Sequence, residues 1–71
     1  MKLKLQSRLD TGYTVYKVIA RNGKQRGRLY RHHRDEEWVA ELYGDDVFGG
    51  KMVFETDTID EARPLIASII E

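Results

Sequence analysis

Basic side chains are concentrated in the stretch RNGKQRGRLYRHHR, residues 21–34, which holds six lysine or arginine residues, two histidines and no acid. In a strand, alternate side chains share one face unless a bulge intervenes, which here would group Arg26, Arg28, Tyr30 and His32. Cationic groups contact phosphates, and an aromatic ring stacks on a base or packs against a sugar. The stretch is therefore predicted to bind nucleic acid, with the candidate residues Lys24, Arg26, Arg28, Tyr30, Arg31, His32 and Arg34.

The alternative is that these cations are neutralised within the protein. The segment EWVAELY, residues 37–43, alternates apolar and polar residues and is predicted to pair with the basic strand. Glu37 and Glu41 would then lie opposite the arginines, and each such cross-strand pair contributes about 0.2–1 kcal/mol. A face neutralised in this way has little net field for a polyanion, so the sequence leaves both interpretations open.

The formal net charge of zero hides a division along the chain. Residues 1–34 carry ten lysine or arginine residues against one acid, which gives +9. Residues 35–71 carry two against eleven acids, which gives −9. Such asymmetry indicates an anion-binding face, a charged surface that selects a protein partner, or a homodimer through complementary halves.

No catalytic or metal site is recognisable among the other reactive residues. Ser7 and Ser68 are the only serines, and neither lies in a nucleophile motif. His32 and His33 are adjacent, so on a strand they would point to opposite faces and could not bind one ion together. We therefore expect no enzymatic activity, no metal and no cofactor.

The segment GDDVFGGK, residues 44–51, contains two carboxylates and three glycines. Its spacing fits neither a phosphate-binding loop nor an EF-hand loop. We predict a hairpin connection whose glycines adopt unusual backbone angles. Phe48 within it is predicted to pack as a satellite core residue.

A chain of 71 residues has room for one small domain with a thin core. It has no cysteine, so neither a disulfide nor a thiolate metal site supplements that core. The N-terminal MKLKLQSRLD alternates charge with leucine, unlike a signal peptide, and no apolar run approaches the roughly 20 residues needed to span a bilayer. These features predict a cytoplasmic protein without a membrane partner.

The hydrophobic pattern predicts an α+β fold in which an antiparallel sheet of four to five strands packs on one C-terminal helix. The expected strands are residues 2–9, 13–20, 24–32, 37–43 and 51–56. Turns are expected at residues 10–12 and at Asn22-Gly23, a pair that tolerates positive φ, and Gly27 is a candidate bulge.

The last segment changes to helical spacing and predicts a helix over residues 60–70 with an irregular start. Thr58 and Glu61 form a capping-box pattern, but Pro64 would then lie past the first turn. Either Asp60 is the cap or a short turn precedes a helix that begins near Pro64. The expected apolar stripe is Ile59, Ala62, Leu65, Ile66, Ile69 and Ile70, and it would cover Trp38, Leu42, Met52 and Phe54 of the sheet.

Residues 26–67 resemble the AP2-type DNA-binding domain and the related arm-binding domains of phage-type integrases. The shared features are RG at 26–27, WVAEL at 38–42, DTIDEA at 57–62 and the order of three strands and a helix. The resemblance implies an open sheet face in the DNA major groove, contacted by Arg26, Arg28, Arg31, Trp38 and Glu41, and so adds Trp38 to the candidates. Tyr43 departs from the family arginine, and the last strand offers only Lys51.

The function expected from these features is that of a small, non-enzymatic binding module of phage or mobile-element type. It would bind nucleic acid through the 13–34 hairpin and the open sheet face. The alternative is a protein-interaction module or a modulator of a host enzyme. The ending FETDTIDEARPLIASI is similar to the strand-then-helix end of HicB-type antitoxins, which bind a toxin partner.

Overall fold

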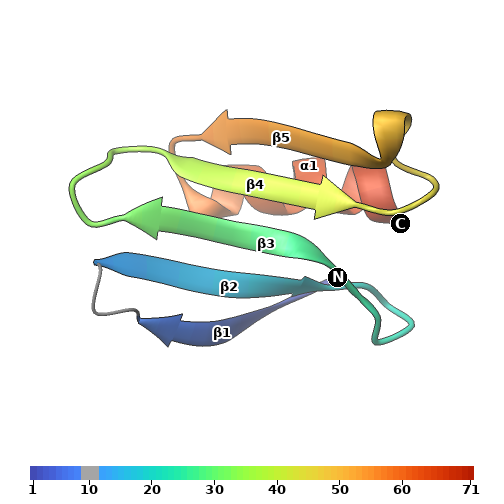
Figure 1. The fold of residues 1–71 in the computed structure, drawn as a ribbon, viewed down its shortest axis with the longest axis horizontal. Helices are drawn as coiled ribbons and strands as arrows, with labels where there is room; N and C mark the ends of the chain where they lie inside the picture. Colours follow the sequence, from blue (N-terminus) through green and yellow to red (C-terminus); the bar gives the residue numbers. More distant parts are fainter. Residues whose placement is uncertain (9–11) are drawn as a thin grey trace.

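The computed structural model describes residues 1–8 and 12–71, which form one antiparallel sheet and one C-terminal helix (Figure 1). The strands are β1 (Lys2–Arg8), β2 (Tyr13–Ile19), β3 (Gln25–His32), β4 (Trp38–Tyr43) and β5 (Lys51–Thr56), and the helices are η1 (Phe48–Gly50) and α1 (Ile59–Ile70). The strands lie in sequence order β1-β2-β3-β4-β5, and every neighbouring pair is antiparallel. The predicted α+β fold of five strands and one helix is confirmed.

The turn between β2 and β3 is the one that the Asn22-Gly23 pair predicts. Gly23 has φ +86°, in the left-handed region that glycine adopts without a steric cost. The turn is closed by Ala20 N–H donating to the Lys24 carbonyl at 2.9 Å and by Lys24 N–H donating to Asn22 Oδ1 at 3.0 Å. Leu9 and the first two residues of the other predicted turn, 10–12, lie outside the described residues.

A β-bulge interrupts the pairing of β2 with β3 near Gly27. Val18 is the Cα partner of Gly27, whereas Ile19 is the partner of Gln25, so Arg26 is an extra residue on β3. Gly27 is buried, and a Cβ atom built on it would lie 2.1 Å from the Glu41 carbonyl oxygen. The bulge therefore lies where the sequence predicts one, at a position too close to β4 for any side chain.

The start of α1 differs from both alternatives considered for it. Thr58 is the N-cap, and its hydroxyl accepts a hydrogen bond from Glu61 N–H at 3.1 Å. Glu61 Oε2 in turn accepts from Asp57 N–H at 3.3 Å. The helix therefore begins at Ile59. Pro64 lies inside it, past the first turn. Among the described residues no helix is long and apolar enough to cross a membrane.

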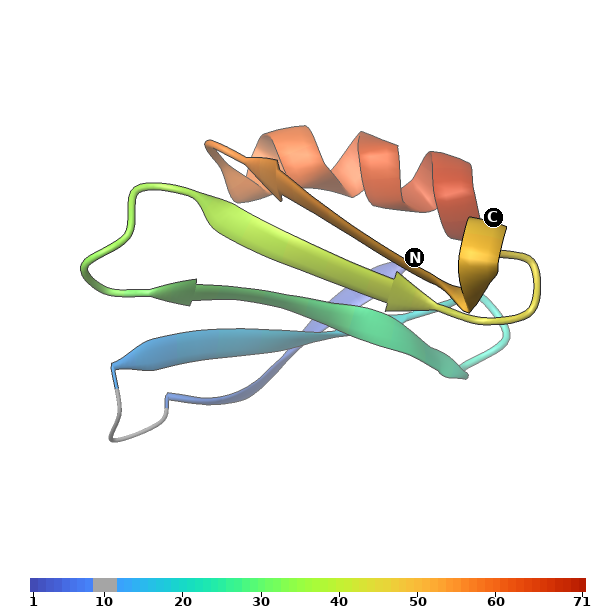
Figure 2. The ribbon, with the colours of Figure 1, turned by 45° about the horizontal axis from the view of Figure 1, so that its top comes forward.

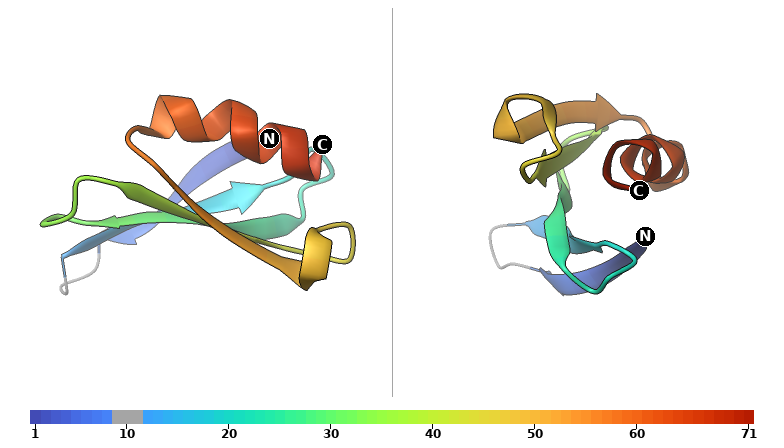
Figure 3. Two further views of the ribbon diagram at one scale, coloured as in Figure 1. Left: turned by 90° about the horizontal axis from the view of Figure 1, so that it is seen from above. Right: turned by 90° about the vertical axis from the view of Figure 1, so that its right-hand side faces the viewer.

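The helix covers one face of the sheet, and the sheet curls around it (Figures 2 and 3). The buried cluster between the layers consists of Val18, Ala20, Leu29, Ala40, Leu42, Ala62, Ile66 and Ile70, with Trp38, Phe54, Ile59 and Ile69 packed against it at partial exposure. Two predictions about burial were wrong. Leu65 is 48% exposed on a groove that it lines with Met52 and Phe54 of β5. Phe48 is 91% exposed in η1, which has no buried residue. The opposite sheet face remains open.

Candidate nucleic-acid interface

Three cationic side chains lie in register across the first three strands on the open face. Lys4 of β1 is the Cα partner of Lys17 of β2, and Lys17 is the partner of Arg28 of β3. Their neighbours Leu3, Val18 and Leu29 pack on the helix side, so strand alternation directs these three to the open side. We call Lys4, Lys17 and Arg28 the cationic row. Like charges placed directly opposite one another destabilise a sheet, so this arrangement carries a cost.

Glu41 of β4 ends the cationic row. Arg28, whose side chain is 47% exposed, lies opposite Glu41 in the register and contacts it with Nη2 3.2 Å from Oε1. Lys51 Nζ lies 3.8 Å from the same oxygen. The predicted pairing of Glu41 with an arginine is thus present, but only at the β4 end of the row. Lys4 and Lys17 face other cations.

An aromatic hollow adjoins the cationic row on the same face. It has a volume of about 210 Å³ and is lined by Tyr13, Val15, Arg28 and Tyr30. The Tyr13 and Tyr30 rings meet edge to face, with centroids 6.2 Å apart. Tyr13 also packs against the His32 ring at 4.9 Å. Rings that hold one another in place next to cations form a surface on which bases can stack.

The Arg26 side chain is held by contacts within the protein. Its Nε donates to the Tyr43 carbonyl at 3.0 Å and its Nη2 forms an ion pair with Asp46. Its side chain is only 13% exposed. Because the bulge makes Arg26 an extra residue on β3, it turns to the β4–η1 connection instead of continuing the row.

Arg31 and Trp38 lie on the side of the sheet that α1 covers. The Arg31 guanidinium carbon is 5.2 Å from the centre of the Trp38 ring, and the Trp38 ring lies 5.9 Å from that of Tyr16. Arg31 Nη1 donates to the Asp35 carbonyl at 3.3 Å. These two candidates therefore do not share a surface with Arg28 and Tyr30.

The other candidates occupy opposite ends of β3. Lys24 is exposed in the turn before the strand, and Arg34 is exposed in the loop after it. His32 Nδ1 accepts from Arg34 N–H at 3.2 Å. The structure thus groups three of the eight candidates, Arg28, Tyr30 and His32, and places the other five away from this group. Sequence reasoning missed Lys4, Lys17 and Tyr13, which show the same alternation but whose alignment depends on the register.

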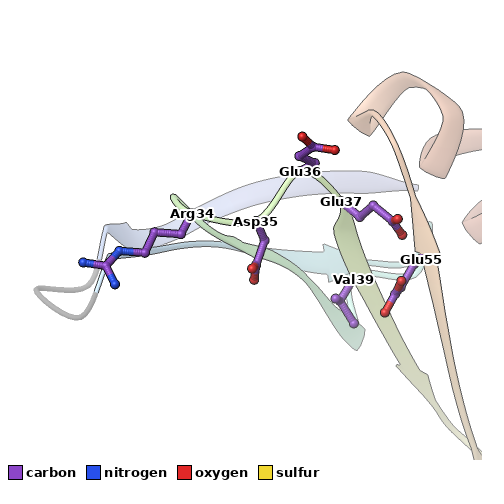
Figure 4. A pocket seen from close by; sticks show the side chains of 6 residues that line it. All are labelled: Arg34, Asp35, Glu36, Glu37, Val39 and Glu55. Carbon is purple, nitrogen blue, oxygen red and sulfur yellow. The ribbon is translucent and has the colours of Figure 1, made fainter.

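An acidic hollow of about 530 Å³ lies at the loop end of β4, apart from the cationic row. Its lining is Arg34, Asp35, Glu36, Glu37, Val39 and Glu55. Figure 4 shows the carboxyl groups of Glu37 and Glu55 turned toward one another. The hydrogen bond to Glu55 and the negative charges of Glu55, Asp57 and Glu36 raise the pKa of Glu37 above its ordinary value. Glu37 precedes β4 and has no partner in its register with β3, so the alternative in which Glu37 lies opposite an arginine was wrong.

The Glu37→Gln variant is expected to melt at a higher temperature than wild type at neutral pH. The folded protein holds the Glu37 proton more tightly than the unfolded chain, so this stabilising contribution is full below pH about 4 and is lost as the pH rises through the raised pKa. Glutamine keeps the neutral form, so the gain should vanish in acid. Thermal denaturation at both pH values measures it. Asp45→Asn, in an exposed loop, is the matched control, and an equal gain there would contradict the prediction.

Among the described residues, no group of three or more potential metal ligands is placed to hold an ion. Comparison with protein families, with curated proteins and with solved structures finds no match to this chain. The resemblance to AP2-type domains therefore stays a prediction.

Proposed function

We propose that this protein binds nucleic acid through the open face of β1, β2 and β3. The observation that carries the proposal is the cationic row, in which Lys4, Lys17 and Arg28 are aligned without an intervening acid. Neighbouring like charges cost stability in the isolated protein, and a polyanion bound across them would relieve that cost. A row of cations that repel one another in the free protein is therefore suited to binding phosphates.

The aromatic hollow supplies the second part of such a site. Tyr13, 37% exposed, and half-buried Tyr30 flank the Arg28 end of the row. Phosphates on the row would leave the attached bases within reach of these rings, and stacking on aromatic side chains tolerates any base. The arrangement favours binding with little sequence preference.

Fluorescence anisotropy with labelled oligonucleotides, single-stranded and duplex, tests the proposal. Three phosphate contacts give a slope of about −2.1 for a single strand and about −2.7 for a duplex in log K against log salt, so a fourfold rise in salt should weaken binding about 20- to 40-fold. If neither oligonucleotide binds at low salt, the proposal is wrong. If duplex alone binds, the role of the tyrosines is wrong, because paired bases cannot stack on them.

A protein-interaction module is the second candidate function, and apolar exposure favours it. An apolar groove of about 360 Å³ lies between β5 and α1, lined by Met52, Phe54, Glu55, Leu65 and Ile69. It lies at the opposite edge of the sheet from the cationic row, so the two functions do not compete for one surface.

A further inference from the structure

The two edges of the sheet differ in how they are protected. The β1 edge carries Lys2 and Lys4 and a register shift between Leu5 and Ser7, both of which discourage pairing with another strand. The β5 edge pairs with β4 without a shift from Thr56 to Lys51. No strand of the described residues lies beyond β5. A regular edge of this kind is a template for a further strand.

Hydrogen bonding at the end of β5 shows which residues offer backbone groups to that edge. Gly44 N–H donates to the Gly50 carbonyl at 3.2 Å, so the Gly50 carbonyl points toward β4. The Gly44–Gly50 pair continues the register of Tyr43 with Lys51, and hydrogen-bonded pairs alternate with non-hydrogen-bonded pairs along an antiparallel ladder. The N–H and C=O groups of three residues therefore point outward: Lys51, Val53 and Glu55.

We propose that a second copy of this chain pairs with β5, antiparallel and centred on Val53. In this register Lys51 lies opposite the partner's Glu55, and Glu55 lies opposite the partner's Lys51. Each of the three outward residues then donates one hydrogen bond and accepts one. Shifting the centre to Met52 places Lys51 opposite Val53, and shifting it to Phe54 places Glu55 opposite Val53. Only the centre at Val53 matches both charges.

Side chains on both faces fit this arrangement. A two-fold axis normal to the sheet keeps both helices on one side, so the two apolar grooves meet and cover Leu65, which is 48% exposed. On the open face, Val53 is 54% exposed and would pack on its own counterpart. In the single chain, Glu55 adjoins the Glu37 carboxyl group. In the dimer, Glu55 would also lie next to the positive charge of the partner's Lys51.

The position of η1 limits the pairing to β5 itself. Figure 1 shows η1 on the free-edge side of the start of β5. In the proposed register, Phe48 lies opposite the segment that follows the partner's Thr56. Its 91% exposure would fall in the dimer. The Phe48 ring would therefore be partly covered at the end of the paired strands.

Sedimentation velocity over about a hundredfold range of concentration tests the proposal, because mass action makes a dimer concentration-dependent. We expect wild type to reach the dimer mass. Val53→Pro should remain monomeric yet folded, since Val53 makes no hydrogen bond to β4 and proline is tolerated on edge strands. A wild-type monomer at every concentration overturns the proposal, as does a dimer in Val53→Pro.

Charge exchange provides a test that does not depend on proline. Lys51→Glu and Glu55→Lys should each lower the association constant about tenfold or more, and the double exchange should restore it to within about threefold of wild type. Arg63→Glu, which matches the charge change of Lys51→Glu but lies on the exposed face of α1, should leave the association constant unchanged. Failure of the double exchange to recover association overturns the register.

Discussion

Lys17→Glu is expected to weaken oligonucleotide binding about tenfold or more and to lower the salt slope by about one. Lys17 lies at the centre of the cationic row, between Lys4 and Arg28. Reversing the charge of Lys17 removes one phosphate contact and places a negative charge on the path of the bound nucleic acid. It also offers Arg28 a second carboxylate. Anisotropy titrations at two salt concentrations measure both quantities.

Stability separates this loss of binding from misfolding. Because Lys17 faces two cations, Lys17→Glu replaces two repulsive cross-strand pairs with attractive ones, each worth about 0.2–1 kcal/mol. The variant should therefore melt no lower than wild type while it binds more weakly. Arg63→Glu changes the net charge equally but lies on α1, and it should retain binding. Equal losses in the two variants would show that only net charge matters and would contradict the proposed site.

Gly27→Ala is expected to destabilise the protein by at least about 2–3 kcal/mol. The new methyl group would lie 2.1 Å from the Glu41 carbonyl oxygen and 2.9 Å from Leu42 Cδ2. The first of these is a backbone atom, so β3 and β4 must separate to admit it. A domain of this length has roughly 4–10 kcal/mol of stability, so the loss is a large fraction. Urea denaturation measures it.

Gly23→Ala is the matched control for Gly27→Ala. Nothing lies within 4 Å of a Cβ atom at Gly23, but its φ of +86° strains any other residue. That strain costs about 1–2 kcal/mol, whereas Gly27 has no positive φ and its cost is entirely steric. Gly27→Ala should be the less stable of the two. The opposite order would show that the approach of β3 to β4 is not tight.

The sequence was sufficient for the order and type of elements because each depends on local chemistry. Alternation of apolar and polar residues identified the strands, Asn22-Gly23 identified a turn, and the spacing of Thr58 and Glu61 matched a cap that the structure contains. These patterns involve residues close together in the sequence, so they can be identified without knowing which strands pair.

The candidate site was less predictable because it depends on register. One extra residue at the β3 bulge turns Arg26 away from the row, and alternation places Arg31 with Trp38 on the helix side. Lys4 and Lys17 are separated in sequence and become neighbours only through the pairing of β1 with β2. A shift of one residue in that pairing would have broken the row.

The meander topology converts a division along the chain into a division in space. Residues 1–34, with a formal charge of +9, supply β1, β2 and β3, and residues 35–71, with −9, supply β4, β5 and α1. The molecule therefore has a large electric dipole moment directed across the strands, although its formal net charge is zero. In an applied field it should rotate more readily than it migrates. At neutral pH and low ionic strength, both cation- and anion-exchange resins should retain it, each holding a different end.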